Sequence, residues 1–359
     1  MMRLTEKYTI DIGKGVYMSK MYRGNLARTG EYPAAGISTF NKVLWRFATG
    51  NRICSTPALA GGRLYFGSQD GFVYSLNAPD GAVLWKFDMK EPTHSSPAFE
   101  NGIVYIGCTD GALYAIEAAS GVMLWKYQTG GHVDCCPAVD NGIVYVGSCD
   151  SFMYALGAEN GKLIWKYKTK DGDIKGVSSS PAINGNNIYF GSFDNNVYAL
   201  DKTSGEPVWS FETGGMIHST PAVANGTVYI GSVDENLYAL SERDGRMKWK
   251  YKTGGAASTA AISNDKIFFG SHDYSVYALD AFSGEFIWKY KTEGEIYGAP
   301  SIAQNVYIGS FDYNIYMLDA MDGTCKWKFK TGFFIISTPV HGDGVLYATS
   351  RDHSIYAIV

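Results

Sequence analysis

The sequence contains few of the features that mark several common classes of protein. Basic and acidic side chains nearly balance, with 31 Lys and Arg against 35 Asp and Glu, and the formal net charge is −4 at pH 7. No basic run breaks this balance, which argues against binding to nucleic acid. No apolar stretch approaches the length of a membrane span, and the first residues, MMRLTEKYTIDIGKG, lack the apolar segment of a signal peptide. We therefore expect a cytoplasmic protein that binds neither nucleic acid nor membrane.

Cysteine and helical patterns are also scarce. The six cysteines show no framework spacing, as is usual for thiols in a reducing compartment. No apolar stripe of 3.6-residue period has a useful length. The apolar runs are instead short, rich in Val, Ile, Tyr, Phe and Trp, and separated by turn residues, which is typical of β-strands.

The tryptophans reveal an internal repeat. They lie about 40 residues apart and number eight: Trp45, Trp85, Trp125, Trp165, Trp209, Trp249, Trp288 and Trp327. Such a period indicates one supersecondary unit copied along the chain, whose core forms only when the copies stack. The chain is therefore expected to be one architecture rather than several domains.

Each copy reads as four antiparallel strands. A Ser/Thr-Pro-Ala segment starts the unit, a Gly-Ser-x-Asp corner precedes a Tyr-Ala-Leu strand, and the tryptophan lies in the fourth strand. Asn-Gly pairs such as Asn141-Gly142 supply the turn between the first two strands. The aspartate of the corner occurs eight times, so we interpret it as a structural cap rather than a catalytic group.

The two ends of the chain are expected to meet. A glycine lies four residues before seven of the tryptophans, but Asn41 takes its place before Trp45, and the chain stops at Val359 after a third strand. Residues 43–48 would then supply the fourth strand of the last unit. We predict an all-β, eight-bladed β-propeller closed in this way, with residues 1–42 as an N-terminal arm and 43–359 as a single domain.

Two segments carry a resemblance to a known family. The motif Tyr-Ala-Leu-Asp-x-x-Ser-Gly-x-x-x-Trp, at residues 198–209 and 277–288, resembles the tryptophan-docking motif of pyrroloquinoline-quinone-type eight-bladed propellers. The lead-in at residues 22–30, YRGNLARTG, is similar to the segment before the first blade of bacterial members. The resemblance is closest in style to the cofactor-free bacterial members.

The resemblance implies two kinds of function. Members are either exported quinone-dependent dehydrogenases or cofactor-free propellers that bind proteins, such as the outer-membrane assembly lipoprotein. This chain has no recognisable counterpart of the calcium ligands and catalytic carboxylates of the dehydrogenases, so we expect neither cofactor nor metal. Their vicinal disulfide over the quinone does have a sequence counterpart in Cys135 and Cys136, which equally replace the Ser-Ser of other copies and are expected to be reduced.

Function is expected where the copies differ. Turns between strands one and two and between strands three and four lie on one face, the turn face, and have similar Asn-Gly or x-Gly sequences from copy to copy. The opposite, variable face carries the loops into each first strand and the Gly-Ser-x-Asp corners. The loop series, three residues before each proline or its equivalent, is Cys54, His94, Asp134, Ser178, His218, Ala257, Tyr297 and Ile336. The corner series, at x, is Gln69, Thr109, Cys149, Phe193, Val233, His272, Phe311 and Arg351.

These residues leave three functions open. The first is a soluble binding propeller that holds a peptide, a protein partner or a small molecule on the variable face; its candidate contacts are Arg52, Cys54, His132, Cys135, Cys136, His272, Phe334 and Arg351. The second is an enzyme with an acid-base pocket at the channel mouth, whose candidates are His94, Asp134, His218, Glu295 and Tyr297. The third is a quinone-dependent oxidoreductase.

Overall fold

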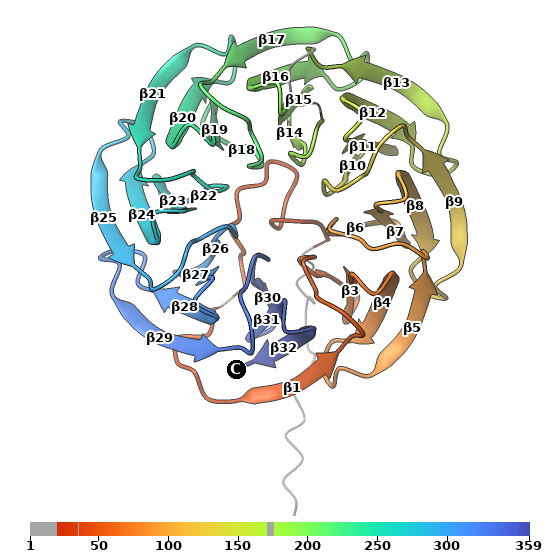
Figure 1. The fold of residues 1–359 in the computed structure, drawn as a ribbon, viewed down its shortest axis with the longest axis horizontal. Coiled ribbons are helices and arrows are strands. Elements are labelled where there is room, and N and C mark those ends of the chain that lie inside the picture. Colours follow the sequence, from red (N-terminus) through yellow and green to blue (C-terminus); the bar gives the residue numbers. More distant parts are fainter. Residues whose placement is uncertain (1–19, 35, 171–175) are drawn as a thin grey trace, which may run out of the picture.

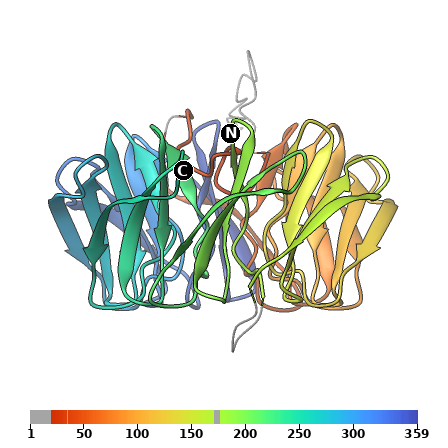
Figure 2. The same ribbon diagram turned by 90° about the horizontal axis from the view of Figure 1, so that it is seen from above.

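The computed structural model describes residues 20–34, 36–170 and 176–359, and within these ranges it forms eight four-stranded antiparallel sheets. The sheets surround a central axis as the blades of a ring (Figure 1), and from the side the ring is a single layer of blades (Figure 2). The predicted eight-bladed propeller is confirmed. Over the same ranges, no helix has the length and apolar character needed to cross a membrane.

Each blade runs from a short inner strand to an outer strand. The inner strands are β2 (Ala58–Ala60), β6 (Ala98–Glu100), β10 (Ala138–Asp140), β14 (Ala182–Asn184), β18 (Ala222–Ala224), β22 (Ala261–Ser263), β26 (Ser301–Ala303) and β30 (Val340–Gly342). The second strands are β3 (Arg63–Gly67), β7 (Ile103–Gly107), β11 (Ile143–Gly147), β15 (Asn187–Gly191), β19 (Thr227–Gly231), β23 (Lys266–Ser271), β27 (Asn305–Gly309) and β31 (Val345–Ser350). The third strands are β4 (Phe72–Asn77), β8 (Ala112–Glu117), β12 (Phe152–Gly157), β16 (Asn196–Asp201), β20 (Asn236–Ser241), β24 (Ser275–Asp280), β28 (Asn314–Leu318) and β32 (Ser354–Ile358). The outer strands are β5 (Val83–Asp88), β9 (Met123–Gln128), β13 (Leu163–Lys168), β17 (Pro207–Glu212), β21 (Met247–Lys252), β25 (Phe286–Lys291), β29 (Cys325–Lys330) and β1 (Val43–Ala48).

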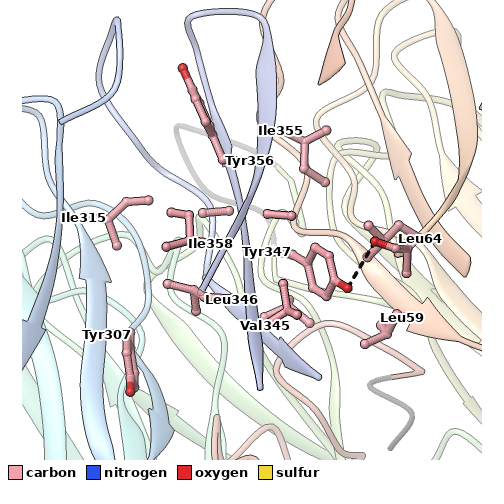
Figure 3. Close-up of a cluster of buried hydrophobic side chains, with 14 of the residues drawn as sticks. Leu59, Leu64, Tyr307, Ile315, Val345, Leu346, Tyr347, Ile355, Tyr356 and Ile358 are labelled. Atoms are coloured by element: carbon pink, nitrogen blue, oxygen red, sulfur yellow. Dashed lines mark hydrogen bonds between the residues drawn. The ribbon is translucent and has the colours of Figure 1, made fainter. Parts of the chain in front are cut away.

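The ring closes through β1. This strand pairs antiparallel with β32, in a register that sets Trp45 opposite Ala357 and Phe47 opposite Ile355, so blade 8 has the order β1-β32-β31-β30. One buried apolar cluster spans the junction and includes residues of blades 7, 8 and 1 (Figure 3). The predicted closure by the N-terminal strand is therefore confirmed.

The repeated aspartates hold the corners. Asp70 accepts hydrogen bonds from the Phe72 amide, from the Gly50 amide of the preceding loop, and from the Tyr74 hydroxyl at 2.8 Å. The aspartate-to-tyrosine bond recurs in all eight blades. These carboxylates are occupied by the fold, as the capping interpretation predicts.

The tryptophans join neighbouring blades. The Trp85 indole of blade 1 donates to the Ala118 carbonyl of blade 2 at 2.9 Å and packs against Gly121 of that blade. A Cβ on Gly121 would lie only 2.7 Å from the indole. The same pair of contacts recurs from Trp45 to Trp288, so each glycine of the motif receives the tryptophan of the preceding blade.

The eighth tryptophan lies at the seam and differs. Blade 8 has no hairpin between its third and outer strands, so it offers Trp327 no glycine of this kind. Within the described part of the chain, the buried Nε1 of Trp327 has no hydrogen-bond partner. Phe40 packs here instead, 6.2 Å from the Trp327 ring and 5.5 Å from Phe329. Because the chain does not run directly from β32 into β1, an aromatic cluster around Phe40 takes the place of the docking contact at this junction.

Residues 20–32, which we call the plug, lie in the centre of the ring (Figure 1). Plug carbonyl groups accept hydrogen bonds from the middle residue of five inner strands: Phe99, Ile183, Val223, Ile262 and Ile302. These residues precede the turns to the second strands, so the plug lies toward the turn face. It therefore closes the axial channel on that side.

Two arginines fix the plug to the ring. Arg28 is fully buried and donates to the Pro181 carbonyl at 3.0 Å and the Pro137 carbonyl at 2.9 Å. Arg23, also fully buried, donates to the carbonyl groups of Arg28 and Ala260. Burial lowers the pKa of Arg23 to about 10, which leaves it charged at pH 7. Backbone carbonyl groups of the plug and of the segments that start the blades thus solvate both cations.

His341, at the centre of β30, contacts the same region. It is fully buried, lies 3.0 Å from Ser301 Oγ, and packs edge-on against the rings of Tyr307 and Tyr32, at 4.4 and 5.2 Å. Burial lowers its pKa to about 3. The side chain is therefore neutral in the folded protein throughout the physiological range.

Gly121→Ala should destabilise the protein more than Gly102→Ala. Both glycines have positive φ, +77° and +79°, so both substitutions incur about 1 kcal/mol of backbone strain. Only at Gly121 would the new methyl group meet an indole, and overpacking adds about 1–3 kcal/mol. Urea unfolding measures both, and equal losses would contradict the docking role of the glycine.

His341→Leu should flatten the pH dependence of stability. As pH falls below about 6.5, the usual pKa of histidine, this side chain binds a proton in the unfolded chain. In the folded chain it does so only near its lowered pKa of about 3. The stabilising effect of neutral His341 is complete above pH 6.5 and is lost by up to about 1.4 kcal/mol per pH unit between these values. Unfolding free energies from pH 7 to pH 4 should show this slope in the wild type. They should show less of it in the variant, and a slope as steep as that of the wild type would contradict a buried neutral imidazole at this position.

Candidate functional site

The loop and corner series form one rim around the channel mouth. Gln69 of the first corner lies 3.4 Å from His94 of the next loop, and the rings of Phe193 and His218 are in contact, tilted by 52°, with centroids 4.6 Å apart. Asp134 accepts a bond from Cys149 of its own blade at 3.8 Å. Loop and corner residues therefore alternate along the rim.

A cavity of about 470 Å³ opens within this rim at blades 5 to 7. Its lining residues are Tyr22, Met216, His218, Ser219, Gly231, Ser232, Val233, Ala256, Ala257, Ser258, Thr259, His272 and Tyr297. Tyr22 belongs to the plug, and the other residues belong to loops, corners and strand ends of the blades. The plug thus supplies the part of the cavity wall that lies toward the turn face.

The titratable groups of the cavity are neutral near pH 7. Burial lowers the pKa of His218, and the neighbouring His272 lowers it further. Burial also lowers the pKa of His272, against the opposing effect of Glu295. Burial raises the pKa of Tyr297, and Glu295 adds to that rise. The cavity therefore offers uncharged imidazole and phenol groups.

A row of stacked rings continues from the cavity along the rim. We call it the ladder: His272, Tyr297, Phe311, Phe334 and the guanidinium of Arg351. Successive centres lie 3.8, 4.3, 4.3 and 4.8 Å apart, and the row alternates between corner and loop residues from blade 6 to blade 8. Tyr297 is 45% exposed, and the other members are partly exposed. Such a contiguous aromatic surface is a feature of binding sites.

The ladder has a side branch toward blade 1. Phe333 stacks on Phe334 at 4.3 Å and on Tyr313 at 5.4 Å, and the Arg52 guanidinium lies 5.7 Å from the Phe333 ring centroid. Four of the predicted contacts, Arg52, His272, Phe334 and Arg351, therefore belong to one surface.

The acid-base candidates are only partly brought together, since His218 lines the cavity with His272 and Tyr297 but His94 and Asp134 lie in other blades. His94, Asp134 and His218 each contact a different rim neighbour, in blades 1, 3 and 4 respectively, so the rim holds them as three separate pairs. His132 is exposed, and its carbonyl accepts a bond from the Cys149 amide. In the described ranges, no group of three or more His, Cys, Asp or Glu is placed to hold a metal ion.

Three candidate cysteines are buried. Cys54 is 8% exposed, and burial raises the pKa of its thiol. Cys135 Sγ accepts from the Gly147 amide as Ser95 Oγ accepts from the Gly107 amide of blade 2. Cys136 Sγ accepts from the Ser96 amide, one blade back. The pair occupies the serine positions of other copies as free thiols.

Sequence reasoning did not select Phe311, Phe333 or Tyr22 as site residues. Phe311 could have been found, because it belongs to the corner series and its corner lies between the loops that carry Tyr297 and Phe334. Phe333 belongs to neither series. Tyr22 had no such signal, because the path of the plug through the ring is not part of the repeat.

Fold and rim together define a tryptophan-docked, eight-bladed propeller whose blades differ on one face. A family model described as outer membrane protein assembly factor BamB matches residues 69–192, 173–294 and 252–332. The chain belongs to this family. No curated protein sequence matches it.

Several solved structures share the fold. BamB from Moraxella catarrhalis is 18% identical, with a TM-score of 0.78 over 88% of this chain and 99% of that one. A europium-containing methanol dehydrogenase is 14% identical, with a TM-score of 0.80 over 92% and 89%. The quinohemoprotein alcohol dehydrogenase from Comamonas testosteroni is 13% identical, with a TM-score of 0.82 over 96% and 80%. At these identities the likeness concerns the fold alone.

All six cysteines should react as free thiols. Alkylation in denaturant without reductant, followed by intact-mass measurement, should add six adducts per chain. In the native state Cys135 should react slowly, since burial raises the pKa of its thiol. Only four adducts in denaturant would indicate a disulfide and contradict the serine-like role of the pair.

Proposed function

We propose that this protein is a binding propeller that holds a polypeptide partner on the rim of its variable face. The ladder is the observation that carries the proposal. Its rings come from three blades of a rigid scaffold, so they are positioned before a partner arrives and little conformational entropy is lost on binding.

Two further points support a polypeptide as the occupant. The ladder runs along the rim, and only its first two members, His272 and Tyr297, line the cavity. An elongated surface of this kind suits an extended chain better than a compact ligand. The family description names an assembly factor, a role that depends on contact with other proteins.

A second candidate function uses the cavity itself. The neutral imidazoles of His218 and His272, together with Tyr297, would suit proton transfer on a small molecule. In this case His218→Asn should abolish turnover while leaving polypeptide binding intact. The binding function does not require this residue.

Substitution on the rim tests the proposal. Tyr297→Ala and Phe334→Ala should each weaken capture of the natural partner at least tenfold, because central aromatic contacts dominate such interfaces. Asn141→Ala, on the turn face, is the control and should leave capture unchanged. Thermal melting should confirm that all three variants remain folded. Undiminished capture by both rim variants would contradict the proposal.

A further inference from the structure

Two arginines share one aromatic platform where blades 8 and 1 meet. Arg351, from the corner of blade 8, lies 4.8 Å from the Phe334 ring centroid, and Arg52, from the loop into blade 1, lies 5.7 Å from that of Phe333. The two phenylalanines stack on each other at 4.3 Å. Stacking holds a guanidinium flat and leaves the N–H groups at its edge free for an acceptor.

Neither cation has an acidic partner. In the part of the chain that the structure describes, no ion pair includes Arg52 or Arg351, and Arg351 Nε is buried without a hydrogen-bond partner. The nearest repeat carboxylate in sequence, Asp352, is occupied by the Ser354 amide, the Gly332 amide and the Tyr356 hydroxyl.

Cys54 lies beside both guanidiniums but does not neutralise them. Burial raises the pKa of its thiol, and the charges of the two nearby arginines and a hydrogen bond with Arg351 only oppose that rise. The platform therefore carries an uncompensated positive charge on a chain whose net charge is −4. A partly exposed guanidinium without a carboxylate partner favours an acceptor supplied from outside.

The opposite end of the ladder, near blade 6, carries a negative charge. Glu295 lies close enough to raise the pKa of Tyr297 and to oppose the lowering of the pKa of His272. A carboxylate is therefore disfavoured near blade 6 and favoured near blade 1. From His272 to Arg351 the ladder is about as long as five residues of extended chain.

We propose that Arg52 and Arg351 bind carboxylates of an acidic segment of a partner polypeptide, whose aromatic side chains pack along the ladder. This inference rests on the proposed binding function and adds the chemistry and direction of the bound segment. Arginine suits this role because its planar fork can donate two parallel hydrogen bonds to one carboxylate. The charge difference between the two ends orients the segment, with its acidic residues toward blade 1.

Synthetic polypeptides test the chemistry without the natural partner. Fluorescence anisotropy should show that a labelled random copolymer of Glu and Tyr binds the wild type, more weakly as salt rises. A Glu homopolymer and a Lys-Tyr copolymer should each bind at least tenfold more weakly. Equal binding of the Glu homopolymer would overturn the part played by the ladder. Equal binding of the Lys-Tyr copolymer would overturn the part played by charge.

Substitutions test the two residues. Arg52→Gln with Arg351→Gln should raise the Kd for the Glu-Tyr copolymer at least tenfold. A matched control, Arg243→Gln with Arg246→Gln, removes the same charge from exposed positions on the turn face and should stay within twofold. The exposed Arg52→Gln alone should give an intermediate loss and tests the site even if the double variant is unstable. Unchanged Kd in folded Arg52 and Arg351 variants overturns the inference.

Capture of the natural partner by the variants distinguishes a failure of this inference from a failure of the proposed function on which it rests. If Tyr297→Ala loses the partner while the double arginine variant retains it, the binding function stands and the acidic segment is wrong. If neither variant affects capture, the rim function itself fails.

Discussion

An indole ring lying against a glycine is the contact on which this molecule depends. Each tryptophan reaches from one blade to the next, donates to a backbone carbonyl and fills the space that a side chain at the glycine would occupy. Because the contact is the same at seven of the eight junctions, each of these pairs of blades is held together in the same way. Loops and corners then meet in a fixed alternation, and that alternation brings Tyr297 between His272 and Phe311. The rim is thus a consequence of packing at the other end of each blade.

The repeat explains what could be read from the sequence. Eight blades, the closure by residues 43–48 and the capping aspartates each depend on a feature that recurs, so the departures at Asn41 and Val359 were informative. The ladder was only partly accessible: His272, Tyr297, Phe334 and Arg351 were candidates, but as separate residues. Their mutual contacts depend on how loop and corner residues alternate around the rim, and the structure was needed to show this alternation.

Features that occur once could not be found in this way. The plug uses two arginines bound to carbonyl groups, and neither residue belongs to the repeat. Likewise, His341 takes a position held by Leu59 in blade 1 and becomes a buried neutral imidazole only because Tyr32 and Tyr307 enclose it. The candidates His94 and Asp134 illustrate the converse: position on the same face does not imply contact, because each lies in its own sector of the ring.

The plug and β1 together make the first part of the chain depend on the last. Carbonyl groups of residues 20–32 bind inner strands as distant as Ile302, and β1 pairs with β32. During synthesis, the plug gains its inner-strand partners one after another, from Phe99 to Ile302, whereas β1 has no partner strand until β32 has been made. For that interval the backbone edge of β1 that pairs with β32 is unpaired. Closure of the ring therefore waits for β32, and a chain that ended before residue 354 would lack the closing strand pair.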